Sequence, residues 1–278
     1  MSSRNKTRGN ELKYSVNVNS DIGNKKKVNQ DALMVKHART QKMGKVCFAC
    51  LCDGMGGLSQ GEVASAAFIN RMGQWFQNEF PSILSREAEA SVKAETEELT
   101  AYIDSKNYIC RLIQNEWEMI SRQMNEGLKQ YGRGRGFQLG TTAAAIIFLG
   151  DEFFAMSVGD SRIYKIDRAG ITQISHDHSY VQQQIDMGRM TPQEAAVSPQ
   201  KSILLQCIGA SDNVYPEFYK GTLEKKTSFL LCSDGLWRLL SNEEIKEYVS
   251  KKDGIKKMTE IVKARGESDN ISGIVIGL

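Results

Sequence analysis

Residues 50–62 read CLCDGMGGLSQGE, an apolar segment that runs into Asp53 and then into a glycine-rich stretch. Four of the eight residues that follow Asp53 are glycine. Glycine at such a place forms a tight turn at the end of a strand, or it lets another group approach the backbone closely. The first interpretation is purely structural and the second is functional, and the rest of the chain has to decide between them.

The composition predicts a globular protein. The chain has 278 residues, of which 41% are hydrophobic and 25% charged, enough for one or two domains with a substantial core. The 36 Lys and Arg residues nearly balance the 33 Asp and Glu residues, so the charge does not require a nucleic acid or an anionic membrane as partner. No apolar run in the sequence reaches the ~18–20 residues that span a bilayer. We therefore expect no membrane span and a soluble, cytoplasmic protein.

The first residues differ in character from the rest. Residues 1–12 are polar and lack the apolar segment of a secretory signal, so they predict a flexible N-terminal arm. No internal repeat and no proline-rich linker divides the chain that follows. We expect residues 13–278 to form a single domain.

Two of the six cysteines, Cys47 and Cys50, have the C-x-x-C spacing of zinc and redox sites. A zinc site needs further ligands, but the sequence has no second C-x-x-C and only three histidines. The favoured interpretation is that these cysteines are reduced thiols on a strand in the hydrophobic core.

Two stretches show the three- and four-residue spacing of amphipathic helices. Apolar residues from Phe68 to Phe80 predict one helix, with Pro81 as its end. A longer helix is predicted from Ile109 to Leu128, ending before Gly132. Both apolar stripes are typical of core faces rather than of a cofactor site.

The character of the sequence changes at Thr142. Short apolar runs follow one another, with turns at 150–151 and 168–170, and another apolar run begins at Thr227 and ends on Asp234-Gly235. Ser241 and Glu244 have the spacing of a capping box, a further helix is expected at 255–264, and 270–278 reads as a strand. Since hairpins connect most of the strands, we expect an α+β fold of antiparallel sheets covered by helices.

Acidic residues recur at the ends of the predicted strands: Asp31, Asp53, Asp160, Asp234 and Asp269. Each alone is typical of a turn, but burying several like charges together requires compensating cations. Carboxylates without His or Cys companions favour hard ions such as Mg²⁺ or Mn²⁺. The pattern indicates a metal centre at one edge of the sheets if the five acids converge, which the sequence alone leaves open.

Eight motifs stand in a characteristic order along the chain. They are NQD (29–31), DGMGG (53–57), GE.AS (61–65), GTT (140–142), VGDSR.Y (158–164), HDHS (176–179), CSDGLW (232–237) and SDNIS (268–272). Together they resemble the metal-dependent serine/threonine phosphatases of the protein phosphatase 2C type, from about Tyr14 to the C-terminus. Met55 in the glycine motif is similar to the bacterial branch of that family.

The resemblance implies a four-layer α-β-β-α sandwich, in which helices flank two packed antiparallel sheets, with a metal centre at one end. It makes Asp53 the carboxylate that bridges two ions of Mn²⁺ or Mg²⁺. The Gly54 carbonyl, Asp234 and Asp269 match the other ligands. Asp160 matches the residue that, together with Asp234, can hold a third ion.

Three further residues match groups around the ion pair: Gln30, Asp31 and Asn270. Of these, the resemblance also gives Asp31 a catalytic role beside Asp53. The resemblance also implies that two bound ions would lower the pKa of a water to about 7, and that the hydroxide so supplied would attack the phosphoserine or phosphothreonine of a protein directly. Direct attack by this hydroxide is a mechanism that needs no covalent nucleophile. The resemblance further implies two partners: a phosphorylated protein as the substrate, and a Ser/Thr kinase whose action the phosphatase opposes.

Lys26 departs from the family pattern, because arginine usually stands five residues before the NQD aspartate and binds the substrate phosphate. Lysine keeps the charge but lacks the planar two-pronged donor. Lys26 is therefore either the phosphate-binding residue or one more solvated lysine between Lys25 and Lys27.

Met55 also departs, since it replaces a histidine that animal members use as a general acid. Leaving-group protonation must then come from a metal-bound water or another group. His176 and His178 are alternatives, but His178 and Ser179 match a motif that begins a helix, which favours a structural role.

Residues 179–213 correspond to the family's variable flap, without its usual HP pair and arginine. The YGRGRGF stretch at 131–137 is interpreted as a connector rather than an RNA contact. Two alternatives to a protein phosphatase stay open: a metallophosphatase for a small phosphorylated metabolite, and a catalytically silent relative that binds phosphoproteins as a scaffold.

Overall fold

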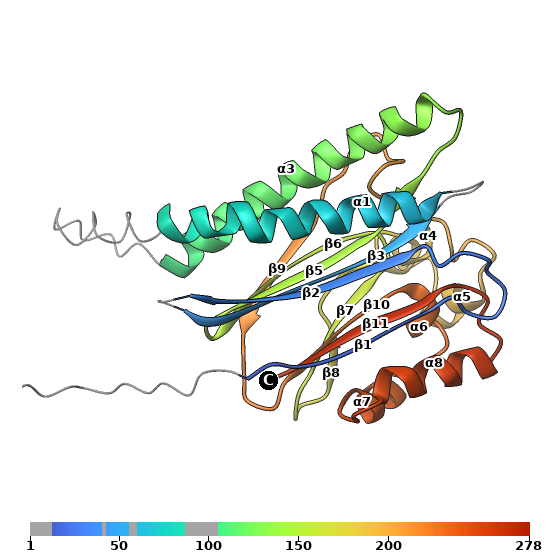
Figure 1. Cartoon of the computed structure of the whole chain (residues 1–278). Coiled ribbons are helices and arrows are strands. Elements are labelled where there is room, and N and C mark those ends of the chain that lie inside the picture. The colour runs from blue at the N-terminus through green and yellow to red at the C-terminus, as the bar shows by residue number, and fades with distance from the viewer. Residues whose placement is uncertain (1–12, 41–42, 56–59, 87–104) are drawn as a thin grey trace, which may run out of the picture.

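Two antiparallel β-sheets lie face to face in the computed structural model, which describes residues 13–40, 43–55, 60–86 and 105–278 (Figure 1). The first sheet has the order β1-β11-β10-β7-β8, and the second has the order β2-β3-β5-β6-β9 with β4 beside β3. The strands are β1 (Ser15–Asp21), β2 (Asp31–Thr40), β3 (Gly44–Met55), β4 (Gly140–Thr141), β5 (Ala143–Leu149), β6 (Glu152–Val158), β7 (Arg162–Ile166), β8 (Ile171–Gln173), β9 (Glu217–Thr222), β10 (Ser228–Cys232) and β11 (Ile271–Gly277).

Helices cover the outer face of each sheet. Figure 1 shows α1 and α3 over the second sheet, and α7 and α8 against the first. The helical elements are α1 (Gly61–Gln74), the π-helical η1 (Trp75–Glu79), α3 (Ser105–Arg133), α4 (Tyr180–Asp186), α5 (Pro192–Val197), α6 (Asp234–Trp237), α7 (Asn242–Val249) and α8 (Gly254–Ala264). This arrangement confirms the predicted four-layer α-β-β-α sandwich.

The two-residue period of β3 explains how the layers hold together. Phe48 and its same-face neighbours pack under α1 and α3, against Trp75 and Trp117. Leu51 lies on the opposite face of β3, in the core between the sheets that also contains Phe229 of β10. Because successive side chains of a strand point to opposite faces, a buried strand of this kind is apolar throughout.

The predicted hairpins and caps are confirmed. Strands β5 and β6 pair around residues 150–151, and β7 pairs with β8 across the turn at 167–170. Ser241 accepts a hydrogen bond from the Glu244 backbone N–H, and the Glu244 carboxylate accepts one from the Ser241 N–H. The capping box therefore begins α7 where the sequence pattern places it.

The prediction that Pro81 ends its helix is wrong, because helical structure continues over residues 80–86. Directly before the proline, η1 replaces the ordinary hydrogen bonds with wider ones, and the Phe80 N–H donates to the Trp75 carbonyl. Such π-turns change the backbone path, which is one way in which a helix accommodates a proline. The second helix also extends past the expected limit, through Gly132 to Arg133.

All six cysteines are buried free thiols, as predicted. Burial raises the pKa of Cys47 to about 12, so this thiol stays protonated at neutral pH. Within the described ranges, no helix is long and apolar enough to cross a membrane. The predicted arm, residues 1–12, lies outside the described residues, and the domain boundary at residue 13 stays a prediction.

Candidate metal centre

Strand register brings the five predicted acids to one end of the sandwich. Asp31 at the start of β2 is the direct partner of Asp53 near the end of β3. Asp160 follows β6, whose last residue pairs with the first residue of β5, at the same end of the sheet. Asp234 begins α6 just after β10, and Asp269 precedes β11, the antiparallel neighbour of β10. The convergence that the sequence leaves open is present.

The backbone around Asp53 is held by two threonines. The Asp53 N–H donates to the Thr142 hydroxyl at 2.9 Å, and the Thr142 N–H donates back to the Asp53 carbonyl at 2.9 Å. The Thr141 hydroxyl donates to the same carbonyl at 3.0 Å. These bonds fix the position from which the Asp53 carboxylate projects.

Gly54 lies where no side chain fits. A Cβ at this position would stand 2.2 Å from the Gly61 carbonyl oxygen and 2.5 Å from that of Gln30. The Gly54 N–H donates to the Gln30 carbonyl at 3.1 Å, which ties the end of β3 to the start of β2. Close approach of backbone, rather than a turn alone, therefore explains this glycine. Gly56 and Gly57 of the same motif lie outside the described residues.

The acids raise one another's pKa values. Burial raises the pKa of Asp53 well above its ordinary range, and the charges of the other four acids raise it further. Burial, with the charges of Asp234 and Asp269, raises the pKa of Asp31 to about 7. Burial and Asp234 likewise raise the pKa of Asp160 to about 7, although Arg238 opposes the shift. The folded protein therefore disfavours full ionisation of these acids unless a cation is bound among them.

Two cations contact the acids. The Arg238 guanidinium lies 2.7 Å from Asp234 Oδ2 and 3.3 Å from Asp160 Oδ2. Lys26 Nζ lies 2.7 Å from Asp269 Oδ1. Burial alone would lower the pKa of Lys26, but the hydrogen bond to Asp269 and the charges of Asp53 and Asp234 raise it overall. Lys26 is thus part of the charge cluster and not merely a solvated lysine.

The donor set fits a hard divalent cation. Asp31 Oδ1 and Asp234 Oδ1 are buried and have no hydrogen-bond partner. Buried carboxylate oxygens of this kind are costly unless something positive satisfies them. In the described part of the chain, no three His, Cys, Asp or Glu side chains already form a closed ligand cluster. The residues therefore match Mg²⁺ or Mn²⁺ by chemistry, with side-chain adjustment needed to close around an ion.

Asn270 orders the loop that carries Lys26. Its side-chain N–H groups donate to the carbonyls of Ile22 and Val28, at 2.9 and 3.1 Å, and its oxygen accepts from the Gln30 N–H at 2.9 Å. The Gln30 side chain donates to Glu62 in α1 rather than to an acid of the cluster. Asn270 and Gln30 therefore act on the centre through the backbone they hold.

Ser233 contacts the cluster directly. Its hydroxyl donates to Asp31 Oδ2 at 3.0 Å. That bond uses one oxygen of Asp31 and leaves Oδ1 without a partner.

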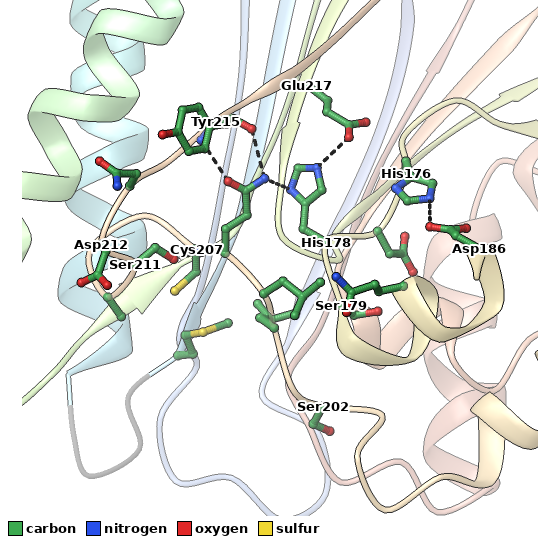
Figure 2. Close-up of a pocket in the computed structure, with 18 residues that line it drawn as sticks. His176, His178, Ser179, Asp186, Ser202, Cys207, Ser211, Asp212, Tyr215 and Glu217 are labelled. Carbon is green, nitrogen blue, oxygen red and sulfur yellow. Dashed lines mark hydrogen bonds and ion pairs between the residues drawn. The ribbon is translucent and has the colours of Figure 1, made fainter. Parts of the chain in front are cut away.

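A pocket of about 830 Å³ borders the centre at Met55 and is lined largely by the predicted flap (Figure 2). Figure 2 shows His176 and His178 on one side of the pocket, with Asp212 and Tyr215 on the facing loop. Among its described lining residues are several acids and neither Lys nor Arg. A second cleft, of about 630 Å³, lies between the helices of the flap and Asp160, Arg238 and Asp269.

The structural role expected for the HDHS motif is confirmed. Ser179 caps α4 by accepting a hydrogen bond from the Gln182 N–H. The His178 Nδ1 atom accepts from the Gly159 N–H at 3.1 Å, and its Nε2 atom faces Glu217 at 3.4 Å. His178 therefore fastens the flap to the residue before Asp160.

Sequence reasoning missed Arg238, Thr142 and Ser233 as parts of this site. Arg238 stands four residues after Asp234, a spacing that places the two side chains on one face of a helix and was readable in the sequence. Thr142 and Ser233 lie inside the GTT and CSDGLW motifs, but their roles could not be read there, because these roles depend on contacts between distant segments.

The comparisons with known proteins agree with this geometry. Protein phosphatase PhpP from Streptococcus pneumoniae is 28% identical over 263 residues, which covers 93% of this chain and 94% of that protein. A serine/threonine phosphatase structure from S. agalactiae is 25% identical, with a TM-score of 0.75 over 95% of this chain and 99% of that one.

A third comparison concerns the fold alone, at 24% identity and a TM-score of 0.71 over 95% of this chain and 97% of the other. It is the catalytic domain of the phosphatase PstP, solved in complex with two manganese ions. The family model described as protein phosphatase 2C matches residues 23–274. The chain therefore belongs to the protein phosphatase 2C family.

Proposed function

We propose that this protein is a metal-dependent phosphatase that hydrolyses phosphoserine and phosphothreonine in proteins. The observation that carries the proposal is the set of five carboxylates at one end of the sandwich, two of which keep a buried oxygen without a partner. Family membership and the names of the relatives support the same activity.

The ion ligands in this proposal are Asp53, Asp234, Asp269 and the Gly54 carbonyl, and the ions are two Mn²⁺ or Mg²⁺. Bound divalent ions supply a nucleophilic water of lowered pKa and positive charge for the phosphate. The chain's own residues hold the geometry. Thr141 and Thr142 fix Asp53 through its backbone. Ser233 orients Asp31, whose free oxygen is available to accept a proton from the attacking water.

Lys26 is the residue that we assign to the substrate phosphate. It is partly exposed beside Asp269, and Asn270 holds its loop. The Lys26 ammonium group already contacts the Asp269 carboxylate, and its other N–H groups can donate to a substrate phosphate.

A protein substrate is favoured over a small metabolite, because the space beside the centre is much larger than a phosphate ester needs. The 630 Å³ cleft, which Asp160 and Asp269 line together with the flap, and the neighbouring 830 Å³ pocket leave room for a peptide segment beside the phosphorylated residue. The complete set of acids argues against a silent scaffold. The cytoplasmic location and the opposing kinase stay predictions.

The activity is tested with p-nitrophenyl phosphate and with a phosphothreonine peptide, each with Mn²⁺ and with EDTA. We expect turnover of both substrates only with the metal. Asp53→Asn should reduce turnover to background while circular dichroism stays unchanged, since an amide is a poor ligand for a hard cation. Glu247→Gln, on the exposed face of α7, is the matched control and should keep full activity. Metal-independent turnover, or an active Asp53→Asn variant, would contradict the assignment.

A further inference from the structure

The Arg238 guanidinium occupies the gap between two acids of the candidate metal centre. One nitrogen, Nη2, lies 2.7 Å from Asp234 Oδ2 and 3.3 Å from Asp160 Oδ2. All three side chains are nearly buried, with 14% of Arg238, 12% of Asp234 and 6% of Asp160 exposed. The arginine is therefore an internal part of the centre.

Several contacts hold Arg238 and Asp160 in this position. The Arg238 backbone N–H donates to the Asp234 carbonyl at 3.0 Å, at the end of α6. The indole N–H of Trp237 donates to the Asp160 carbonyl at 3.0 Å, which ties the loop after β6 to the same helix. The arginine and both acids are thus fixed relative to one another by hydrogen bonds to the Asp234 and Asp160 backbone carbonyls, independently of their own ion pairs.

The charge of Arg238 is permanent. Burial alone would lower its pKa, but the charges of Asp234 and Asp160 raise it, and a guanidinium stays protonated under all conditions in which the protein is folded. A divalent ion placed between the same two oxygens would stand within a few ångströms of this cation, and like charges at that distance repel strongly.

We propose that Arg238 fills with its own charge the place between Asp160 and Asp234 that a third metal ion would otherwise take. Asp160 then pairs with arginine and is not a metal ligand. Asp234 serves both partners, with Oδ2 on Arg238 and the unpartnered Oδ1 available to an ion. The inference rests on the proposed function, because it assumes that Asp53, Asp234 and Asp269 bind two ions.

The test counts bound Mn²⁺ per chain by equilibrium dialysis and elemental analysis, over a range of free Mn²⁺ up to millimolar. The wild-type protein should saturate at two ions. Arg238→Ala should bind one more, whereas Arg238→Lys, which keeps a cation in the gap, should stay at two. Arg265→Ala, which removes an arginine from the surface pair with Glu244, is the control and should also bind two.

Asp160 supplies a second, independent arm. In the wild-type background Asp160→Asn should leave the count at two, and in the Arg238→Ala background it should abolish the additional ion. Thermal unfolding of every variant confirms that the counts come from folded protein. If Arg238→Ala does not fold, the Arg238→Lys and Asp160→Asn counts still decide.

The outcomes separate this inference from the proposed function. Three ions on the wild-type protein, a drop below two in Asp160→Asn, or an unchanged count in folded Arg238→Ala would each overturn the role of Arg238. A wild-type protein that binds no Mn²⁺ would instead overturn the metal centre itself, and the proposed function with it.

Discussion

Single residues decide how charge is distributed at the end of the sandwich. Asp53 is surrounded by other acids, and its neighbours Gly54 and Thr142 hold its backbone rather than its charge. Compensation comes from Arg238 on one side and Lys26 on the other. Arg238 is fixed by two acids, whereas Lys26 contacts one and is 39% exposed, which is why we propose Lys26 rather than Arg238 as the cation that binds the substrate.

Replacing Lys26 should change substrate binding more than the chemical step. We expect Lys26→Ala to raise KM for a phosphopeptide by roughly tenfold, the equivalent of one charge-assisted hydrogen bond. Lys26→Arg should preserve or lower KM, because guanidinium offers two parallel donors to phosphate. Steady-state kinetics on the two variants, with Lys25→Ala as the adjacent exposed control, measures the effect. An unchanged KM in both Lys26 variants would remove this residue from the site.

The acids of the site could be predicted from the sequence because each stands next to an apolar run and inside a motif of the family. Asp53, Asp160 and Asp234 follow such a run, and Asp31 and Asp269 precede one. Their partners could not. Thr142 acts on Asp53 through bonds between β3 and the start of β5, and Ser233 reaches Asp31 from the other sheet. Both residues belong to motifs of the family resemblance, but their contacts exist only after the two sheets pack, so the motifs alone do not reveal their roles.

Elements position these residues by how they begin and end. The segment between β6 and α4 is an example, because Gly159, which precedes Asp160, donates its N–H to His178. Gln206 also contacts Nδ1 of His178, at 2.7 Å, so the loop that leaves the flap meets the same ring. The charged group that faces the Nε2 atom of the His178 ring is Glu217, and His176 and Asp177 also lie close to the ring. One imidazole therefore joins the metal-binding end of β6 to both ends of the flap.

His178 should make folding stability sensitive to mild acid. Burial lowers the pKa of His178, although Glu217 opposes the shift, so the folded value lies below the unfolded value of about 6.5. The stability that neutral His178 contributes is complete above the unfolded pKa of about 6.5. It is lost as the pH falls from there through the lower folded pKa, since the unfolded chain then binds the proton more readily. Protonation would also remove the acceptor that Gly159 uses.

We expect His178→Gln to reduce the loss of unfolding free energy between pH 7 and pH 5 by on the order of 1 kcal/mol. Urea unfolding at several pH values measures this difference. An identical slope in wild type and His178→Gln would contradict the role given to the buried ring.

Element boundaries were predictable where a side chain acts locally. Ser241 and Ser179 cap α7 and α4, because a hydroxyl satisfies a backbone N–H two or three residues ahead. Pro81 misled for the opposite reason. The effect of Pro81 depends on the helical turn before it. That turn is the π-helical η1, which packs through Trp75 and Phe76 on Phe48, and the helix continues beyond the proline.

The molecule as a whole keeps a group of like charges that disfavours folding in the absence of a cation. Ligands that bind only the folded state increase its stability by mass action. At Mn²⁺ concentrations about 100 times the dissociation constant, the increase is about 2.7 kcal/mol for one ion. For a chain of this size we expect Tm to rise by roughly 5 °C or more.

Differential scanning calorimetry with Mn²⁺ and with EDTA tests this expectation. In Asp53→Asn the metal-dependent shift in Tm should shrink, because the shared ligand is gone, while Glu247→Gln should show the full shift. A Tm that does not respond to Mn²⁺ would contradict a metal site at this end of the sandwich.

Strand β11 has a consequence for how the protein is made. It lies between β1 and β10 in the first sheet, and Ser15 of β1 pairs with Gly277 of β11. The first strand of the chain can therefore join the sheet only when the last strand is present. Pairings between such distant segments form late in folding. Asp269 stands immediately before β11. During translation, the proposed ligand set would therefore be complete only after nearly the whole domain has left the ribosome.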